Sequence, residues 1–123
     1  MRTRRQRGQG AYALGIDAEA TARAALVRDG WTILGERVRT AAGEVDIVAE
    51  KAGLLAIIEV KARPRLTDAA AAISMRQRAR LLAATEILLG ENPDWGQAGV
   101  RFDVLTVDAT GTVRRITDAF RLE

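Results

Sequence analysis

The sequence predicts a single α/β domain, a sandwich of helices around a mixed β-sheet. Its 123 residues are the length of one domain and are enough to bury one core. Two segments show the apolar periodicity of helices, and five shorter apolar segments bounded by turn residues are typical of strands. In chain order they run helix, three strands, helix, two strands, which is the pattern of a sheet covered by helices.

The first helix is expected from Ile16 to Arg28. Its apolar face is predicted to consist of residues about one turn apart, namely Ile16, Ala20, Ala24 and Val27. Gly30 stands where a glycine commonly caps a helix C-terminus. Residues 1–11 are rich in Arg, Gln and Gly and are expected to form a disordered arm, so the folded domain is expected at 12–123.

Three strands are expected to follow in close succession. The first is Trp31–Arg39, and the second, Glu44–Glu50, follows a turn at Ala41–Gly43. A turn at Lys51–Gly53 then leads into the strongly apolar strand Leu54–Lys61. Because this connection is short, the second and third strands are expected to form an antiparallel hairpin.

A long helix is expected next, from an N-cap at Asp68 to about Leu89. Its stripe of residues at helical spacing is Ile73, Gln77, Leu81, Ala84 and Leu88. The remaining expected elements are a loop at Gly90–Gly99, a strand at Val100–Val107, a turn at Gly111 and a short strand at Val113–Ile116.

The absence of two residue types excludes many kinds of active site. The chain contains no His and no Cys, which rules out a Ser-His-Asp triad, a cysteine nucleophile and a zinc site made from those ligands. Catalysis would have to depend on Asp, Glu, Lys, Arg, Ser, Thr, Tyr or a bound ion. No apolar stretch approaches the ~20 residues that span a bilayer, and no secretory leader is evident, so a cytoplasmic protein is expected.

The positive charge is concentrated at the N-terminus. The chain has 19 Lys and Arg against 16 Asp and Glu, and four of the arginines lie within Arg2–Arg7. The remainder is therefore nearly neutral. Such a basic arm either contacts phosphate or is simply a soluble terminus, and the sequence leaves both interpretations open.

The hairpin expected at Gly43–Lys61 is the segment most informative about chemistry. If its loop is Lys51–Leu54, the register is fixed. The opposed pairs are then Glu50 and Leu55, Ala49 and Ala56, Val48 and Ile57, Asp46 and Glu59, and Glu44 and Lys61. Because side chains alternate along strands, the four charged residues at the open end share one face. The opposite face is predicted to be core, formed by Val45, Ile47, Ile58 and Val60.

Two ionised carboxylates at the distance of opposed residues need compensation. About 5 Å apart, they repel by roughly 3 kcal/mol at an effective dielectric near 20. A shared proton, a cationic side chain or a divalent metal would each offset this repulsion. The alternative to a metal site is a salt bridge from Lys61 to Glu44 or Glu59, with Asp46 as a solvated acid at the strand end. The spacing alone does not choose between these interpretations.

The spacing of these residues resembles a known nuclease signature. Asp46, twelve intervening residues and Glu59-Val60-Lys61 are similar to the PD-(D/E)xK motif. The surrounding segments are more specific. They are Gly43-Glu44-Val45-Asp46-Ile47-Val48-Ala49, Ile58-Glu59-Val60-Lys61-Ala62-Arg63, Arg101-Phe102-Asp103-Val104, Glu19 before them and Ala119-Phe120 after them. Together they resemble the YraN-like family of uncharacterised bacterial proteins, which is assigned to the restriction-endonuclease-like superfamily and is similar to archaeal Holliday junction resolvases.

The resemblance extends from about Leu14 to Phe120 and implies a fold. The sequence also departs from the family pattern at two positions. The implied fold is the restriction-endonuclease-like three-layer α/β sandwich with a central mixed sheet. Arg37 stands where the family usually has Asn, and Arg76 stands where it usually has Lys. An arginine at the second position would contact phosphate with a different geometry from lysine.

The resemblance also implies roles for the residues of the hairpin. Asp46 and Glu59 would hold Mg²⁺ or Mn²⁺, with the backbone carbonyl of Val60 as a further ligand. Lys61 would position or activate the attacking water, and Glu19 would face the site from the first helix.

Several of the implied roles compete with simpler ones. Glu19 would otherwise form a surface pair with Arg23. Glu44 either supports the metal ligands or pairs with Lys61, and Gln77 either reaches the site or lies at the edge of its apolar stripe. The arginines that would form a phosphate-binding rim, or else a solvated face, are Arg63, Arg65, Arg76 and Arg80.

The sequence therefore predicts a metal-dependent nuclease that hydrolyses phosphodiester bonds in DNA, including branched or otherwise structured DNA. Two alternatives stay open. One is a nucleic-acid-binding module without catalysis, and the other is a protein-interaction subunit of a DNA-processing complex. A symmetric homodimer would suit a two-fold junction, and no membrane partner is expected.

Overall fold

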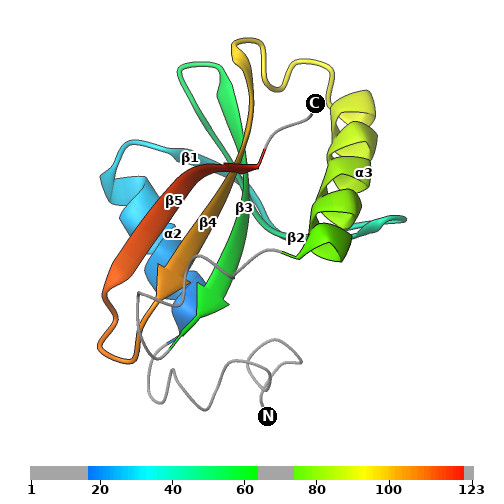
Figure 1. Ribbon diagram of the computed structural model, residues 1–123. Coiled ribbons are helices and arrows are strands. Elements are labelled where there is room, and N and C mark those ends of the chain that lie inside the picture. The colour runs from blue at the N-terminus through cyan, green and yellow to red at the C-terminus, as the bar shows by residue number, and fades with distance from the viewer. Residues whose placement is uncertain (1–16, 64–73, 121–123) are drawn as a thin grey trace.

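Within residues 17–63 and 74–120, seven elements follow one another in the predicted order. The computed structural model describes residues 17–63 and 74–120, without the side chains of 118–120. The elements are α2 (Ala18–Arg28), β1 (Thr32–Thr40), β2 (Gly43–Lys51), β3 (Leu54–Ala62), α3 (Met75–Glu91), β4 (Gly99–Val107) and β5 (Val113–Phe120) (Figure 1). The arm predicted at residues 1–11 lies outside the described residues, as does Arg65.

The five strands form one mixed sheet in the order β1-β2-β3-β4-β5. Three neighbouring pairs are antiparallel, and β3 pairs with β4 in parallel, from Leu54 opposite Gly99 to Ala62 opposite Val107. Parallel neighbours need a long crossover connection, and α3 lies within this one. The sequence thus correctly predicted a mixed sheet.

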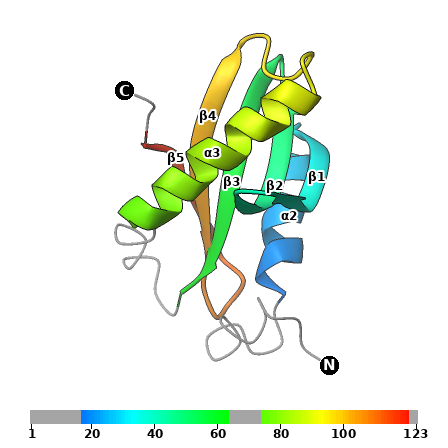
Figure 2. The ribbon, with the colours of Figure 1, turned by 90° about the vertical axis from the view of Figure 1, so that its right-hand side faces the viewer.

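The two helices cover opposite faces of the sheet, so the molecule has three layers (Figure 2). Ala22 and Leu26 of α2 pack on one face, in a buried cluster that includes Ile58 and Val60. Leu81, Ala84 and Leu88 of α3 pack on the other face, in a cluster that includes Leu55 and Ile57. Alternate residues of β3 therefore face different helices, as the pleat of a strand requires.

The buried face of α2 is not the one that the sequence predicted. Ala20 and Ala24 are exposed and the side chain of Val27 is 50% exposed, whereas Ala18, Ala22 and Leu26 are buried. Alanines lie on both sides of this helix, so periodicity favoured neither face. The predicted face included Val27, but Leu26 is the large residue that packs on the sheet.

Gly30 ends α2 as predicted. The Trp31 N–H donates to the Leu26 carbonyl at 3.0 Å, and the Gly30 N–H donates to the Val27 carbonyl at 3.1 Å. These two bonds form a Schellman motif. Gly30 has a φ of +90°, a left-handed conformation that glycine adopts without strain.

The second helix begins later than predicted, at Met75. Ser74 is its N-cap and forms a capping box with Gln77, because each side chain accepts a hydrogen bond from the other residue's backbone N–H. The expected N-cap, Asp68, lies outside the described residues. At the other end of the chain, β5 is longer than the predicted strand because its ladder with β4 continues to Phe120.

Candidate active site

The β2–β3 hairpin turns through two residues, Ala52 and Gly53. Both have positive φ angles, +51° and +79°, which are typical of the tight turns that join twisted antiparallel strands. The ladder then pairs Glu50 with Leu55, Ala49 with Ala56 and Val48 with Ile57. This part of the predicted register is confirmed.

The predicted register does not continue to the acidic end of the hairpin. The β2–β3 ladder ends at Ile47 opposite Ile58, so the predicted pairs of Asp46 with Glu59 and Glu44 with Lys61 are wrong as backbone pairs. Instead, Oδ2 of Asp46 accepts a hydrogen bond of 2.7 Å from the Val60 N–H. A side-chain carboxylate thus replaces a backbone carbonyl as the acceptor for the Val60 N–H. Val60 lies two residues beyond Ile58, the last residue of β3 that pairs with β2.

Strict alternation of side chains also fails at this point of β2. Val45 joins Val48 in the cluster under α3, although the sequence predicted it on the opposite face with Ile47. On the neighbouring strand, Arg37 has a φ of +50°, a conformation that side chains other than Asn and Gly rarely adopt. Arg37 lies between Glu36 and Val38, which pair with Ile47 and Val45, so this irregularity in β1 lies opposite Asp46.

Asp46 and Glu59 are both buried. Their residues are 1% and 3% exposed, so the alternative in which Asp46 is a solvated acid at the strand end is wrong. Nη2 of Arg80, from α3, lies 3.0 Å from Oε1 of Glu59. The other oxygen, Oε2, is also buried and has no hydrogen-bond partner among the described residues. One oxygen of this buried carboxylate therefore has no hydrogen-bond donor within residues 17–63 and 74–120.

Lys61 lies within electrostatic range of both acids. Burial lowers the pKa of Lys61 below its usual 10.5, Glu59 and Asp46 oppose this shift, and Arg63 and Arg80 add to it. Within the described parts of the chain, Lys61 makes no ion pair; the cation on Glu59 is Arg80. The structure thus brings the three residues of the nuclease-like signature into one charged cluster, with two arginines beside it.

The other predicted acids have different partners. Oε2 of Glu19 lies 3.1 Å from Nε of Arg37, and Glu19 is only 6% exposed. The alternative pairing of Glu19 with Arg23 is wrong, because Arg23 pairs with Glu36. The ion pair of Glu44 is a long one, 3.8 Å, with Arg39 on the neighbouring strand. Within residues 17–63 and 74–120, no three acidic side chains converge as a metal-ion cluster, so Glu19 does not join Asp46 and Glu59 in one.

The predicted polar residues of α3 divide into two groups. Arg80 reaches the acidic cluster, whereas Arg76 is exposed and Gln77 is engaged in the capping box with Ser74. The side-chain amide of Gln77 therefore has its hydrogen-bond partner in Ser74 and not in the acidic cluster. Arg63, at the end of β3, donates to the carbonyl of Ala62 and lies close enough to influence Lys61.

Comparisons with known proteins identify the family. The sequence profile of an uncharacterised protein family, UPF0102, matches residues 18–107. A UPF0102 protein of Granulibacter bethesdensis is 58% identical over 117 residues, which are 95% of this chain and 74% of the relative. The chain belongs to the UPF0102 family. A UPF0102 protein of Azorhizobium caulinodans is 40% identical over 119 residues, covering 97% of this chain and 91% of the relative.

The sequence analysis predicted membership of an uncharacterised protein family, and the match to UPF0102 confirms this part of the prediction. The names of the relatives state no activity, and the restriction-endonuclease-like superfamily stays a prediction. No helix among the described residues is long and apolar enough to cross a membrane.

Another buried acid, Asp103, has a role that the sequence analysis missed. It is 2% exposed, and its two oxygens accept four hydrogen bonds of 2.9–3.2 Å from Arg101 and Arg115. Both guanidinium groups also lie over the ring of Trp31, 5.5 and 4.8 Å from its centroid. An Arg two residues before an Asp in an otherwise apolar strand was the available signal, since such residues share a face.

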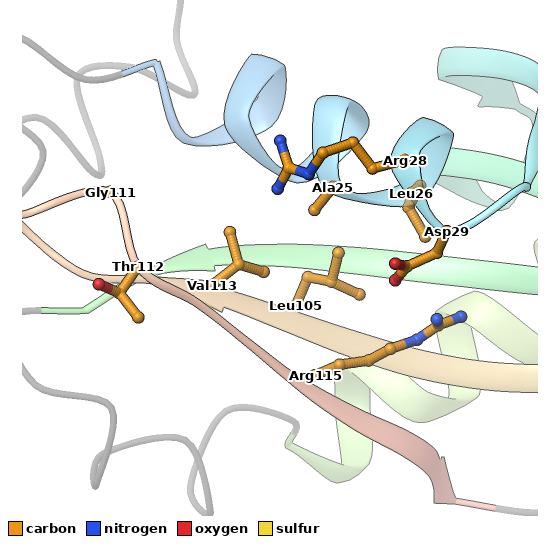
Figure 3. Close-up of a pocket in the computed structure, with 9 residues that line it drawn as sticks. All are labelled: Ala25, Leu26, Arg28, Asp29, Leu105, Gly111, Thr112, Val113 and Arg115. Carbon is orange, nitrogen blue, oxygen red and sulfur yellow. The ribbon is translucent and has the colours of Figure 1, made fainter.

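A cavity of about 400 Å³ lies against Arg115, a partner of Asp103, and is lined by no residue of the acidic hairpin. It opens between the C-terminal end of α2 and the β4–β5 hairpin, as Figure 3 shows. Leu26, Leu105 and Val113 line it together with charges of both signs, Arg28, Asp29 and Arg115. Because Arg115 is already bound to Asp103, the lining has little net charge to attract an ionic ligand.

Proposed function

We propose that this UPF0102 chain is a metal-dependent nuclease that hydrolyses phosphodiester bonds in DNA, including branched or structured DNA, and that it has the restriction-endonuclease-like form of the α/β sandwich. The observation that carries the proposal is the cluster of Asp46, Glu59 and Lys61, with both acids buried and the pKa of the lysine lowered. A lysine of lowered pKa beside two buried acids is a combination typical of active sites.

The donor set suits a hard divalent cation. Asp46 and Glu59 offer carboxylate oxygens, and Oε2 of Glu59 is buried with no hydrogen-bond partner in the described ranges. Mg²⁺ commonly binds through one or two carboxylates and completes its coordination with water and substrate phosphate, so a third acid is not required. Asp46, Glu59 and the carbonyl of Val60 would hold Mg²⁺ or Mn²⁺ in this proposal.

A divalent ion, when bound, supplies positive charge that favours attack on a phosphodiester. Lys61 hydrogen-bonds to the attacking water, and in its neutral form it accepts the proton as the water oxygen bonds to phosphorus. The bond from phosphorus to the leaving deoxyribose oxygen breaks, and that oxygen takes a proton from solvent. A lowered pKa increases the neutral fraction of Lys61 and suits it to this role. Arg63 and Arg80, which lie close enough to influence Lys61, would contact the phosphate oxygens in this proposal.

A cleavage assay tests the proposal. The purified chain is incubated with Mg²⁺ or Mn²⁺ and with single-stranded, duplex, flap and four-way-junction DNA. We expect cleavage of at least one form, reduced by at least about 100-fold in Asp46→Asn and Lys61→Met. Glu86→Gln is the matched control, because Glu86 is an exposed acid on α3 and should leave cleavage unchanged.

The possible outcomes separate the proposal from its alternatives. Cleavage that survives both site substitutions would show that another protein or another site is responsible. Binding of one DNA form without cleavage would favour a nucleic-acid-binding module. Neither binding nor cleavage would favour a subunit that acts through protein contacts.

A further inference from the structure

Arg80 is the cation that the structure places directly on a proposed metal ligand. Its side chain is 36% exposed, whereas that of Glu59 is 4% exposed, so the arginine reaches from the surface to a buried carboxylate. Its contact with Glu59 is a single hydrogen bond from Nη2. Nε of Arg80 is buried and has no partner within the described residues. The contact is therefore close but not the two-bond arrangement that guanidinium and carboxylate groups can form.

The path of Arg80 depends on Gly43 at the start of β2. A Cβ atom added to Gly43 would lie 2.5 Å from Cδ and 2.7 Å from Cγ of Arg80, far inside van der Waals contact. The aliphatic part of the arginine thus passes directly over the glycine backbone on its way to Glu59. A missing side chain on one strand makes room for a long side chain from the helix above it.

The balance of charge indicates that Arg80 and a divalent ion do not share Glu59 easily. Among the described residues, the charges that act on Lys61 are those of Asp46, Glu59, Arg63 and Arg80, so this cluster holds two acids and three cations. Adding two more positive charges increases repulsion with every cation in the cluster, which in a partly buried site is costly. Of these cations, Arg80 is the one bound to a ligand oxygen.

We propose that Arg80 competes with the divalent cation for Glu59 and must leave that carboxylate when the ion binds. This inference rests on the proposed metal site and assigns a further role to a residue beside it. In the metal-free protein, Arg80 balances the buried charge of Glu59. Once displaced, its guanidinium is released toward solvent, where it can bind a phosphodiester. Ion binding and the availability of an arginine for substrate are thereby coupled.

Binding of Mn²⁺ alone to the full chain tests this competition, measured by calorimetry and by electron paramagnetic resonance of the free ion. Arg80→Met keeps an aliphatic stem over Gly43 and removes the charge. We expect Arg80→Met to bind Mn²⁺ at least about tenfold more tightly than the unmodified chain, which corresponds to about 1.4 kcal/mol. Arg80→Gln is a second variant with the same expectation, and circular dichroism checks that each is folded. Arg114→Met removes an exposed arginine on β5 and should leave the affinity unchanged.

Glu59→Gln distinguishes failure of the inference from failure of the proposed site. If Arg80→Met binds Mn²⁺ with unchanged or lower affinity while Glu59→Gln abolishes binding, the competition is wrong and the metal site stands. If no variant binds Mn²⁺, including those without Arg80, both the metal site and the competition are wrong. Tighter binding in Arg80→Met that is lost when Glu59→Gln is added supports both.

Discussion

Asp103 and Glu59 are buried acids on adjacent parallel strands, yet their surroundings differ. Asp103 lies on the side of Trp31, where two arginines donate four hydrogen bonds to its two oxygens. Glu59 lies on the side of α3, where one arginine donates one hydrogen bond and the second oxygen has no partner among the described residues. Both acids are at most 3% exposed, so burial alone does not distinguish them.

The difference indicates what each acid does. A buried charge that is surrounded by matched donors stabilises or organises the fold, and it has no vacancy for a ligand. A buried charge that is only partly satisfied, beside Asp46 and a lysine of lowered pKa, fits the metal ligand of the proposed function. Substitution of Asp103 should therefore lower stability more than ligand binding. Substitution in the acidic hairpin should lower ligand binding more than stability.

The largest loss of stability is expected from Asp103→Ala. Removing this carboxylate leaves two half-buried arginines facing each other, and breaking a buried ion pair in this way costs about 3–5 kcal/mol. Urea denaturation measures the loss. Mn²⁺ affinity, measured where the variant is folded, should be unchanged. Glu36→Gln, which breaks an exposed pair with Arg23, is the control and should cost no more than about 1 kcal/mol. A loss for Asp103→Ala as small as that of the control would contradict the structural role.

A smaller loss is expected from Asp46→Ala, of about 1–3 kcal/mol, because the Val60 N–H would remain buried without its acceptor. Asp46→Asn keeps an oxygen for that hydrogen bond and should cost less than about 1 kcal/mol. Both variants should lose Mn²⁺ binding. Denaturation curves of the pair measure the contribution of the hydrogen bond, and equal stability of the two variants would show that it contributes nothing.

Lys61→Met is expected to stabilise the protein at neutral pH. The pKa of Lys61 is lowered from 10.5 in the folded state, so the unfolded chain binds the proton more tightly. The penalty of burying the charge is fully present below the folded pKa and is relieved as pH rises toward 10.5. The advantage of Lys61→Met should therefore shrink as pH increases, in denaturation curves measured from pH 6 to 10. A difference in unfolding free energy between the two proteins that stays constant across this range would show that burial does not disfavour the charged form of Lys61.

The smallest effect is expected at the hairpin turn, away from both acids. Ala52 is exposed and has a φ of +51°, which Asn tolerates better than Ala. Ala52→Asn creates the Asn-Gly pair preferred in such turns and should add about 0.5–1 kcal/mol of stability. Thermal unfolding measures the gain, with no change expected in Mn²⁺ binding. A decrease in melting temperature would show that the turn does not limit stability.

The sequence predicted local structure better than contacts between distant elements. The order of elements, the cap at Gly30 and the hairpin register near its turn were correct, because each depends on residues close together in the chain. The register was wrong beyond Ile47, where the side chain of Asp46 takes the place of a backbone pair. The face of α2 was wrong because its alanines carry too little difference in hydrophobicity to identify the buried side.

The candidate site was predictable in its acids and its lysine, whose spacing is a sequence property. The ion pair of Arg80 with Glu59 was not, although Arg80 was among the arginines predicted to surround the site. Nothing in the spacing of Arg80 from Glu59 indicates that a helix residue passes over Gly43 to reach β3. The pairing of Glu19 with Arg37 likewise depends on how α2 is placed against β1. These contacts join residues that are distant in the chain. They depend on how the helices pack on the sheet, which the local sequence pattern does not determine.

The left-handed conformation of Arg37 has a consequence for association between molecules. β1 is an edge of the sheet, and a regular edge strand is a template on which another chain can add its own strand. Here the edge is interrupted by a register shift between Ile33 and Gly35 and then by the φ of +50° at Arg37, and it carries the exposed charges of Glu36 and Arg39. The irregularity of β1 opposite Asp46 thus also protects this edge against aggregation.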